Sequence, residues 1–441
     1  MPRDFRTISL RILNDVLKTG KWATDSIEAN VKSIDEEHRD IKKVYELVYG
    51  ILRNKNFIDY HLSTFLNRPT NDETLQNILR IGYYQLRYMR SIPSYAAINT
   101  CVNLAKTHVH PKTGGFVNAV LRKVMKDKLK VKIGAKSKEE YLSVKYSYQV
   151  WFIRLLMKAY PKKSESIMKA GNIKPPVFLK VNSLRTQDSR LKSILKKQGV
   201  EAEPARLLKG AYLVKQGDAS KTPAFEQGFY YIQDLSSQLL CGFVSPRQKD
   251  AVIDIGSAPG GKAAGFAESM RNKGQIIAVE PVKSRVVMMQ RNFVRLGITN
   301  VEIMEHDAAN DIEALHDKGD RVIVDAPCSG LGVIRRHPEK KWGLSEEETK
   351  DFPKLQLAIL NTAAKWVKKK GELYYSTCTI NPEENEKVIE KFLKKNTGFK
   401  AVDIAGKLKK LEEFKSGKYF LSLPGNKHNM DGFFIAKLVK R

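Results

Sequence analysis

Apolar residues recur every three or four positions through the first part of the chain. The clearest apolar faces lie at residues 8–17, 41–52 and 75–86, and further helical stretches follow at residues 95–105 and 115–125. This spacing gathers apolar side chains on one side of a helix, where they pack into a core. Gly20 suits the end of the first helix, because glycine readily adopts the left-handed conformation found there. The pattern predicts an all-helical domain of about 130 residues.

The middle of the chain mixes helical and extended patterns. A helix is predicted over residues 146–160. After two prolines the pattern predicts an extended run at 177–182, a helix at 186–198 and a strand near 212–214. These elements predict a small α+β subdomain.

Short apolar runs alternate with helical patterns through the rest of the chain. The first run opens the stretch 251–267, later runs lie at 275–280, 301–307, 321–325 and 372–378, and a run at 431–438 closes the sheet. Such alternation predicts an α/β domain with a largely parallel sheet. We therefore divide the chain into residues 1–138, 139–224 and 225–441.

A glycine-rich turn follows the first strand of the α/β domain. Gly256, Gly260 and Gly261 give the turn its freedom, Asp254 precedes it, and Glu280 ends the next strand. Ligands bind outside the carboxyl ends of parallel strands, where an acidic residue on the second strand is placed to bind ribose hydroxyls. The spacing matches neither the dinucleotide fingerprint nor the phosphate-cradling loop, which disfavours NAD and ATP. The turn predicts a nucleoside-containing cofactor, with a purely structural turn as the alternative.

The charge of the chain points to a polyanionic partner. Its 441 residues carry 77 Lys and Arg against 48 Asp and Glu, a formal net charge of +29. Nucleic acid is the first candidate, because neutralising its phosphates releases counterions. The alternative is a lysine-rich surface that only keeps the chain soluble. The basic stretch 122–138 has the same two interpretations, a strip that follows a nucleic-acid backbone or a solvated linker.

The sequence favours a cytosolic protein. The first ten residues lack the apolar core of a signal peptide, and the apolar stretch 150–159 is interrupted by Arg154 and Lys158. The four cysteines are Cys101, Cys241, Cys328 and Cys378, without the spacing of metal ligands. Cys328 and Cys378 each follow the end of a predicted strand, so both lie at the edge that holds the glycine turn. Each thiol is therefore either a buried packing residue or a group that takes part in a reaction.

These motifs together resemble a known family. The segments DAPCSGLGVIRRHP (325–338), YYSTCTINPEENE (374–386), APGGK (258–262) and DGFFIAKL (431–438) look like the RsmB (Fmu) group of RNA cytosine-5 methyltransferases. VYGILR, ILRIGYYQLRYM and GFVNAVLRK in the first part resemble the NusB-like RNA-binding domain of that group. The resemblance covers nearly the whole chain. It implies a Rossmann-like class I methyltransferase domain preceded by an all-α NusB-like domain and the small α+β subdomain.

The resemblance also assigns roles. It makes Cys378 the nucleophile that adds to the base and Cys328 the residue that assists release, with Asp325 and Lys262 holding and polarising the base. S-adenosylmethionine is the implied cofactor. Its implied contacts are Gly256, Ser257, Ala258, Pro259, Gly260, Gly261, Lys262, Glu280 at the ribose, Asp307 at the adenine and Asp325 at the methionine end. Arg335, Arg336 and His337 either grip RNA phosphates or solvate their loop.

The chain departs from the family pattern at several positions. Gly256 and Ser257 replace the usual Cys-Ala, and Glu280 replaces Asp, but backbone freedom and charge are retained. Tyr148-Gln149 stands where His-Pro is frequent, and Lys180 where Arg is frequent. These last changes lie in the region expected to face RNA and bear on the substrate more than on the activity.

The implied partner is small-subunit (16S) ribosomal RNA, methylated at carbon 5 of a cytosine. The alternatives are transfer RNA, another ribosomal site, a noncatalytic NusB-like RNA-binding factor, and DNA cytosine methylation. DNA enzymes place the nucleophile in the Pro-Cys motif and do not need Thr377-Cys378. We expect a cytoplasmic monomer with no membrane partner and no metal.

Overall fold

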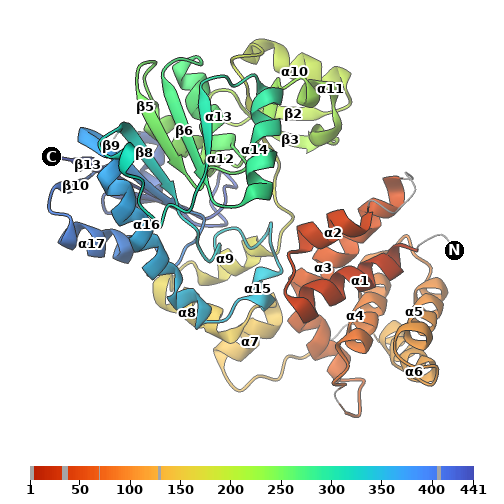
Figure 1. Cartoon of the computed structure of the whole chain (residues 1–441). Coiled ribbons are helices and arrows are strands. Elements are labelled where there is room, and N and C mark those ends of the chain that lie inside the picture. Colours follow the sequence, from red (N-terminus) through yellow and green to blue (C-terminus); the bar gives the residue numbers. More distant parts are fainter. Residues whose placement is uncertain (1–3, 32–37, 69, 128–130, 405–408) are drawn as a thin grey trace. The chain divides into compact units, whose positions relative to one another are not determined.

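The computed structural model describes residues 4–31, 38–68, 70–127, 131–404 and 409–441. By packing, the chain forms two units (Figure 1). The first contains residues 1–174 together with 334–346, and the second contains 175–333 together with 347–441. No helix among the described residues is long and apolar enough to cross a membrane.

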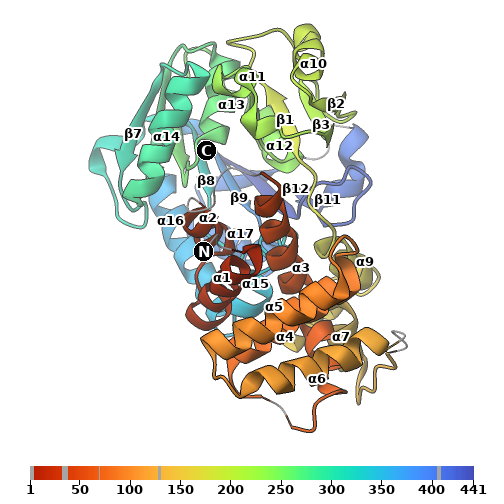
Figure 2. The same cartoon turned by 90° about the vertical axis from the view of Figure 1, so that its right-hand side faces the viewer.

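The first unit is helical, as predicted. Its helices are α1 (Phe5–Thr19), α2 (Ala23–Val31), α3 (His38–Ser63), α4 (Glu73–Tyr88), α5 (Ser94–His108), α6 (Thr113–Lys126), α7 (Lys138–Tyr146), α8 (Val150–Ala159), α9 (Ser164–Gly171) and α15 (Lys340–Gly343). Asp4 caps the start of α1, and Gly20 ends that helix in the left-handed conformation. The predicted apolar faces of α1, α3 and α4 form one core with α5 and α6, and α4, α5 and α6 pack against one another (Figure 2).

The predicted helix at 146–160 is interrupted. Ser147 is left-handed, with φ of 54°, and separates α7 from α8. Its hydroxyl accepts a hydrogen bond from the backbone N–H of Phe57 at 3.0 Å, and Ser143 donates to the carbonyl of Tyr148 at 2.6 Å. The Ser143 bond competes locally with the helical hydrogen bonds, and the bond from Phe57 of α3 holds Ser147, so the helix is interrupted here. Residues 128–130 of the basic stretch lie outside the described residues.

A strap of residues 334–346 belongs to the helical unit although residues 175–333 precede it in the second unit. The indole nitrogen of Trp342 donates to the carbonyl of Leu52 at 2.7 Å, and its ring packs on the helical core. The side-chain amide of Gln149 donates to two strap carbonyls, at 2.7 and 2.8 Å. The strap is therefore fastened to the helices by backbone contacts that its basic sequence does not reveal.

Two basic residues of the strap are buried. Arg335 is 2% exposed, so it does not solvate its loop. The Lys341 ammonium lies 4.0 Å from the centre of the Tyr148 ring and donates to the carbonyl of Arg53 at 3.0 Å. Burial, and to a smaller extent the nearby Arg53, lower the pKa of Lys341 well below its usual value.

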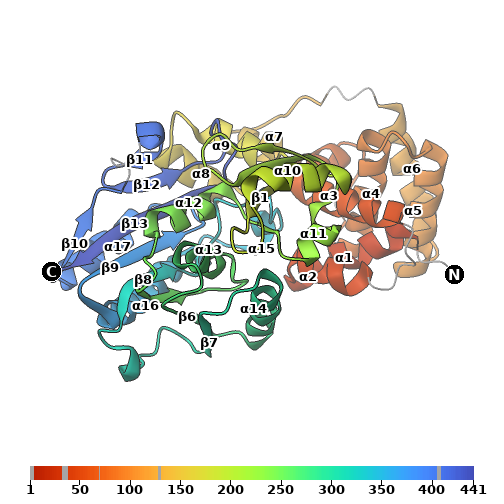
Figure 3. The same cartoon turned by 90° about the horizontal axis from the view of Figure 1, so that it is seen from above.

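The second unit begins with the predicted α+β subdomain. Its elements are β1 (Phe178–Val181), α10 (Asp188–Lys197), β2 (Glu201–Pro204), β3 (Ala211–Gln216), η1 (Ala219–Lys221), α11 (Pro223–Glu226) and β4 (Tyr230–Ile232). The sheet order is β2-β3-β1-β4, all antiparallel. Leu191 and Leu195 of α10 share a buried cluster with Leu179 and Val181 of β1. Figure 3 shows α10 beside the strand β1.

The rest of the second unit is the expected Rossmann-like domain. Its elements are α12 (Leu235–Val244), β5 (Ala251–Ile255), α13 (Gly261–Met270), β6 (Gln275–Glu280), α14 (Lys283–Leu296), β7 (Val301–Glu305), η2 (Glu313–Leu315), β8 (Gly319–Asp325), η3 (Glu348–Lys350), α16 (Phe352–Trp366), β9 (Val367–Thr377), α17 (Glu386–Lys395), β10 (Phe399–Val402), η4 (Lys409–Phe414), β11 (Lys415–Ser416), β12 (Tyr419–Ser422) and β13 (Phe433–Lys440). The order is β11-β12-β13-β9-β8-β5-β6-β7, with β10 on β13.

Strands β5 to β9 are parallel, and β13 runs antiparallel to β9. The run at 431–438 was expected to close the sheet, but β13 is an interior strand with β12 and β11 beyond it. Helices α12, α13 and α14 cover one face and α16 and α17 the other (Figure 1). The carboxyl ends of β5, β6, β8 and β9 therefore meet at one edge.

Candidate active site

The glycine turn after β5 presses against the end of β8. Gly256 has φ of +70°, and its backbone N–H donates to the carbonyl of Val279 at 3.0 Å. A Cβ added there would lie 2.4 Å from the carbonyl oxygen of Asp325, so both conformation and space require glycine. Helix α13 begins directly after the turn, which brings Lys262 of its first turn beside Asp325.

Lys262 and Asp325 form an ion pair at this edge. The Lys262 ammonium donates to Oδ2 of Asp325, and Oδ1 accepts from the Ser376 hydroxyl at 2.9 Å. Burial opposes the charged form of Lys262, but the Asp325 carboxylate outweighs it and raises the pKa of this lysine. The side chains keep 13% and 22% of their surface exposed. A charged donor and a held carboxylate are thus presented together to a polar ligand.

The two predicted cysteines lie together beside this pair. Cys328 follows β8 and Cys378 follows β9, and their sulfur atoms are 3.2 Å apart. All four cysteines lie in the described part of the chain, and each is a thiol rather than half of a disulfide. Cys101 and Cys241 are buried, and burial raises the pKa of each to about 12. Cys328 and Cys378 are only partly buried, which suits the pair for chemistry.

A buried carboxylate ties the two cysteine loops together. Glu384 is 0% exposed and accepts from the backbone N–H and the hydroxyl of Ser329, at 2.9 and 2.5 Å. It also accepts from Asn381 at 3.1 Å, Gln356 at 3.1 Å and Thr379 at 3.3 Å. Sequence reasoning assigned Glu384 no role, and the only signal was its place in the acidic segment after the Thr-Cys motif. The network fixes the residue after one cysteine to the residue after the other.

A second link closes the same loops through backbone atoms. Gly332 donates its N–H to the carbonyl of Cys378 at 3.0 Å and accepts from the N–H of Gly432 at 2.9 Å. A Cβ at Gly332 would lie 2.3 Å from the Gly432 carbonyl oxygen, so a side chain has no room. The separation of the two sulfur atoms is therefore set by the backbone on both sides.

Asp254 supports the turn from beneath. It is 0% exposed and accepts from the Ser257 hydroxyl at 2.6 Å through Oδ2, whereas Oδ1 has no hydrogen-bond partner within the described part of the chain. Burial raises the pKa of this carboxyl to about 7, against the opposing effects of Ser257 and Lys262. Asp254 therefore gains and loses a proton near neutral pH.

This pKa gives stability a defined pH dependence. A carboxyl with a higher pKa in the folded than in the unfolded chain stabilises the fold at acidic pH. The contribution is lost as pH rises from the ordinary value of 3.8 through about 7. The Asp254→Asn variant should therefore have a melting temperature near that of the wild type at pH 4.5 and a higher one at pH 8. The corresponding gain in the free energy of unfolding at pH 8 is at most about 4 kcal/mol. Calorimetry at both pH values measures this, and equal melting differences would contradict the raised pKa.

Glu280 has the surroundings expected of a ribose ligand. It ends β6, is 0% exposed, and its Oε1 accepts from the N–H of Val282 and from Arg285, both at 3.3 Å. Its Oε2 has no partner among the described residues. A buried carboxylate oxygen requires a donor, and a ribose hydroxyl is one. The residues of this edge fit a nucleoside cofactor.

Asp307 lies at the same edge but in a different setting. The N–H of His306 donates to the carbonyl of Glu280 at 3.2 Å, which joins the two strand ends. Asp307 itself is exposed, and its Oδ1 accepts from the N–H of Ala309 at 2.9 Å. The structure thus brings Asp254, Lys262, Glu280, Asp325 and the cysteine pair together, with Asp307 at the rim. Arg335 and its neighbours lie on the strap, in the helical unit.

Comparison with known families covers most of the chain. The family described as "16S rRNA methyltransferase RsmB/F" matches residues 242–439, the NusB family matches 3–126, and the RsmF/B-like ferredoxin-like domain matches 148–219. The segment containing both cysteines lies within the first match.

Whole-length relatives give the same picture. A "Probable ribosomal RNA small subunit methyltransferase B" of Bacillus subtilis is 32% identical, covering 99% of this chain and 98% of the relative. The Escherichia coli "Ribosomal RNA small subunit methyltransferase B" is 28% identical over 100% and 99%. The crystal structure of PH0851 has a TM-score of 0.82 at 26% identity, over 98% of both chains. A methyltransferase homologue from Pyrococcus horikoshii has a TM-score of 0.60 at 27% identity, over 70% of this chain and 100% of that one.

Proposed function

Because the chain belongs to the RsmB/F family of methyltransferases, which use S-adenosylmethionine, we propose that it methylates carbon 5 of a cytosine in small-subunit ribosomal RNA. The family indicated by the sequence motifs is thereby confirmed. The observation that carries the proposal is the pair of thiols 3.2 Å apart at the ends of β8 and β9, beside Lys262 and Asp325. Carbon 5 of cytosine is a poor nucleophile, and a thiol that adds to the ring overcomes this.

In the proposed reaction Cys378 is the nucleophile. Its thiolate adds to carbon 6, forming a carbon–sulfur bond and moving the electrons of the ring double bond toward carbon 5. S-adenosylmethionine supplies, when bound, a methyl group made electrophilic by its sulfonium. Carbon 5 takes this methyl group as the methyl–sulfur bond breaks, and the electrons of that bond stay on the sulfur, which leaves as a neutral thioether. The carbon 5 proton then leaves to a base, its electrons restore the double bond, and the bond to Cys378 breaks.

Cys328 is proposed to assist that last step. Its sulfur, 3.2 Å from the attacking sulfur, is within reach of the same face of the ring, where it acts as or through a general base for the carbon 5 proton. The Glu384 network supports this assignment because it holds the two loops in one register. Lys262 and Asp325 are proposed to hold and polarise the base through its exocyclic groups.

The proposed cofactor contacts use the remaining residues of the edge. The turn from Gly256 to Lys262 faces the cofactor, Glu280 accepts from the ribose, and Asp307 lies on the adenine side. The orphaned Oε2 of Glu280 supports the ribose assignment. Asp325 is proposed to lie near the methionine end.

The remaining parts are proposed to bind RNA. We keep residues 1–138 as an RNA-binding domain, 139–224 as an RNA-binding subdomain and 225–441 as the catalytic domain. The protein is proposed to act as a monomer in the cytoplasm, on naked RNA or on the small ribosomal subunit. The net charge of +29 supports a polyanionic substrate.

The test is transfer of labelled methyl from S-adenosylmethionine to purified small ribosomal subunits, 16S RNA and transfer RNA. We expect label in the 16S substrates, recovered after nuclease digestion as 5-methylcytidine. Label in transfer RNA alone would move the substrate to the alternative, and label on another atom or base would contradict carbon 5. No transfer to any of the three RNAs would favour an RNA-binding factor without catalysis.

A further inference from the structure

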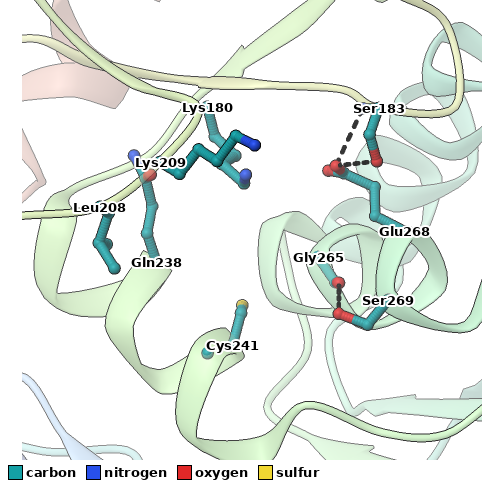
Figure 4. A pocket seen from close by; sticks show the side chains of 10 residues that line it. Lys180, Ser183, Leu208, Lys209, Gln238, Cys241, Gly265, Glu268 and Ser269 are labelled. Carbon is teal, nitrogen blue, oxygen red and sulfur yellow. Dashed lines mark hydrogen bonds between the residues drawn. The ribbon is translucent and has the colours of Figure 1, made fainter. Parts of the chain in front are cut away.

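A cavity of about 260 Å³ lies in the second unit, and its lining residues are different from those of the candidate active site (Figure 4). The small sheet and the helices α12 and α13 supply its walls. Its lining residues are Lys180, Ser183, Leu208, Lys209, Gln238, Cys241, Gly242, Gly265, Glu268 and Ser269. Pockets for drug-sized ligands begin at about 300 Å³, so this volume suits a single small polar unit.

Two lysines give the cavity its charge. Lys180 lies on β1 and Lys209 on the loop before β3, and both side chains extend over the opening in Figure 4. Neither ammonium group has a hydrogen-bond or ion-pair partner within the residues that the structure describes. Two unpaired cations on one small cavity attract an anion.

The acidic residue of the cavity is already satisfied. Glu268 accepts from the N–H and the hydroxyl of Ser183, at 3.0 and 2.9 Å, and from the hydroxyl of Tyr231 at 2.9 Å. Figure 4 shows the Ser183 bonds on the side of the cavity opposite Lys209. These three donors spread the charge of the carboxylate, so the two lysines are not paired with it.

A buried amide adds a second requirement. Gln238 is 4% exposed, and its amide nitrogen donates to the carbonyls of Gln233 at 2.9 Å and Leu179 at 3.4 Å. Its amide oxygen has no partner in the described part of the chain. Both partners of the nitrogen are backbone carbonyls, which only accept hydrogen bonds, so the orientation of the amide is fixed. Its buried oxygen therefore requires a hydrogen-bond donor. A ligand of this cavity must therefore carry an anion and a hydrogen-bond donor.

The cavity is joined to the candidate active site by α13. Lys262 lies in the first turn of this helix, and Gly265, Glu268 and Ser269 of the cavity follow within about 10 Å of helix axis. The thiol of Cys241 in the cavity wall donates to the carbonyl of Lys262 at 3.7 Å. A ligand bound here lies close to the residues proposed to hold the target base.

We propose that this cavity binds one nucleotide of the substrate RNA strand next to the methylated base. Its phosphate lies on Lys180 and Lys209, and a hydroxyl or amino group of the nucleotide donates to Gln238. The sequence flanking the target is thereby held while the base reaches the cysteine pair. The proposal rests on the proposed function in taking RNA as the substrate.

The test compares two double variants of equal charge. Lys180→Met/Lys209→Met removes both cavity cations, and Lys391→Met/Lys395→Met removes two exposed lysines from α17, outside the parts of the chain proposed to bind RNA. Binding to a single-stranded RNA oligonucleotide is measured from 50 to 300 mM salt, and kcat and KM for methyl transfer are measured alongside.

The cavity variant is expected to weaken RNA binding about tenfold and to lower the slope of log affinity against log salt by about 0.7, as for one lost phosphate contact. The KM of this variant for RNA should rise, whereas its kcat should stay within about twofold of the wild-type value. Its affinity for S-adenosylmethionine should not change. The control variant should do none of this.

Equal effects of both double variants, or none from the cavity variant, would overturn the proposal. Because oligonucleotide binding needs no turnover, the two hypotheses fail separately. A wild type that binds RNA through these lysines without methylating it would refute the proposed function and leave the cavity assignment standing.

Discussion

Replacing Cys378 by alanine is expected to reduce methyl transfer by about 10⁴-fold or more, because a catalytic nucleophile has no substitute within its site. S-adenosylmethionine binding should persist, since the cofactor edge at Gly256 and Glu280 does not depend on this thiol. Transfer of labelled methyl to RNA, with calorimetric binding of the cofactor, measures both. Cys101→Ala is the matched control, because it removes a buried thiol from the helical unit.

Cys328→Ala is expected to behave differently from Cys378→Ala. The attack can still occur, but the adduct lacks the group 3.2 Å away that helps it break down. Protein and RNA should then stay linked through denaturing electrophoresis, and ribonuclease should collapse the shifted band. Two results would contradict this assignment: a protein–RNA adduct that forms with Cys378→Ala, or full activity of Cys378→Ala together with an inactive Cys328→Ala. Either result would make Cys328 the nucleophile, as in the DNA enzymes.

Removing the charge of Lys262 is the second large effect. Lys262→Met should lower kcat by about 10²- to 10³-fold, the usual loss when one preorganised donor is removed from a site of this kind. Lys273→Met, an exposed lysine beyond the other end of α13, is the matched control. Because Asp325 raises the pKa of Lys262, the wild type should show no loss of this charge as pH rises toward 9.

The ion pair also predicts non-additivity. Asp325→Asn alone should cost a similar factor, and the double variant should cost much less than the product of the two, because each side chain needs the other. Cofactor titration separates a loss of binding from a loss of turnover. Fully additive losses, or a Lys262→Met variant with wild-type kcat, would show that the pair does not act as a unit.

Much of this arrangement could be predicted because it follows from short-range rules. Gly20 ends α1 as its position in the apolar pattern indicates. Cys328 and Cys378 converge because the carboxyl ends of adjacent parallel strands share an edge, which a sequence of strands already implies. The same rule predicted that Asp254 and Glu280 lie near the ends of their strands, beside the glycine turn.

What could not be predicted depends on partners distant in the chain. Glu384 stands in a polar, acidic segment that resembles a solvated loop, yet five donors bury it. The break at Ser147 depends on the N–H of Phe57, which no local pattern announces. The sequence of the strap is that of a basic loop. Its hydrogen bonds, however, join it to the carbonyl of Leu52 and the side-chain amide of Gln149, which lie far earlier in the chain.

That strap has a consequence for how the protein is made. Synthesis proceeds from the N-terminus, and domains generally fold as they emerge. Trp342 and the carbonyl of Leu52 can meet only after residues 175–333 have been synthesised. The helical unit therefore starts to fold first but gains its last contacts late. By then the strand β8 and the Cys328 loop have already left the ribosome. A chain cut after residue 174 would lack part of its own packing, so the two units are not interchangeable modules joined at a single point.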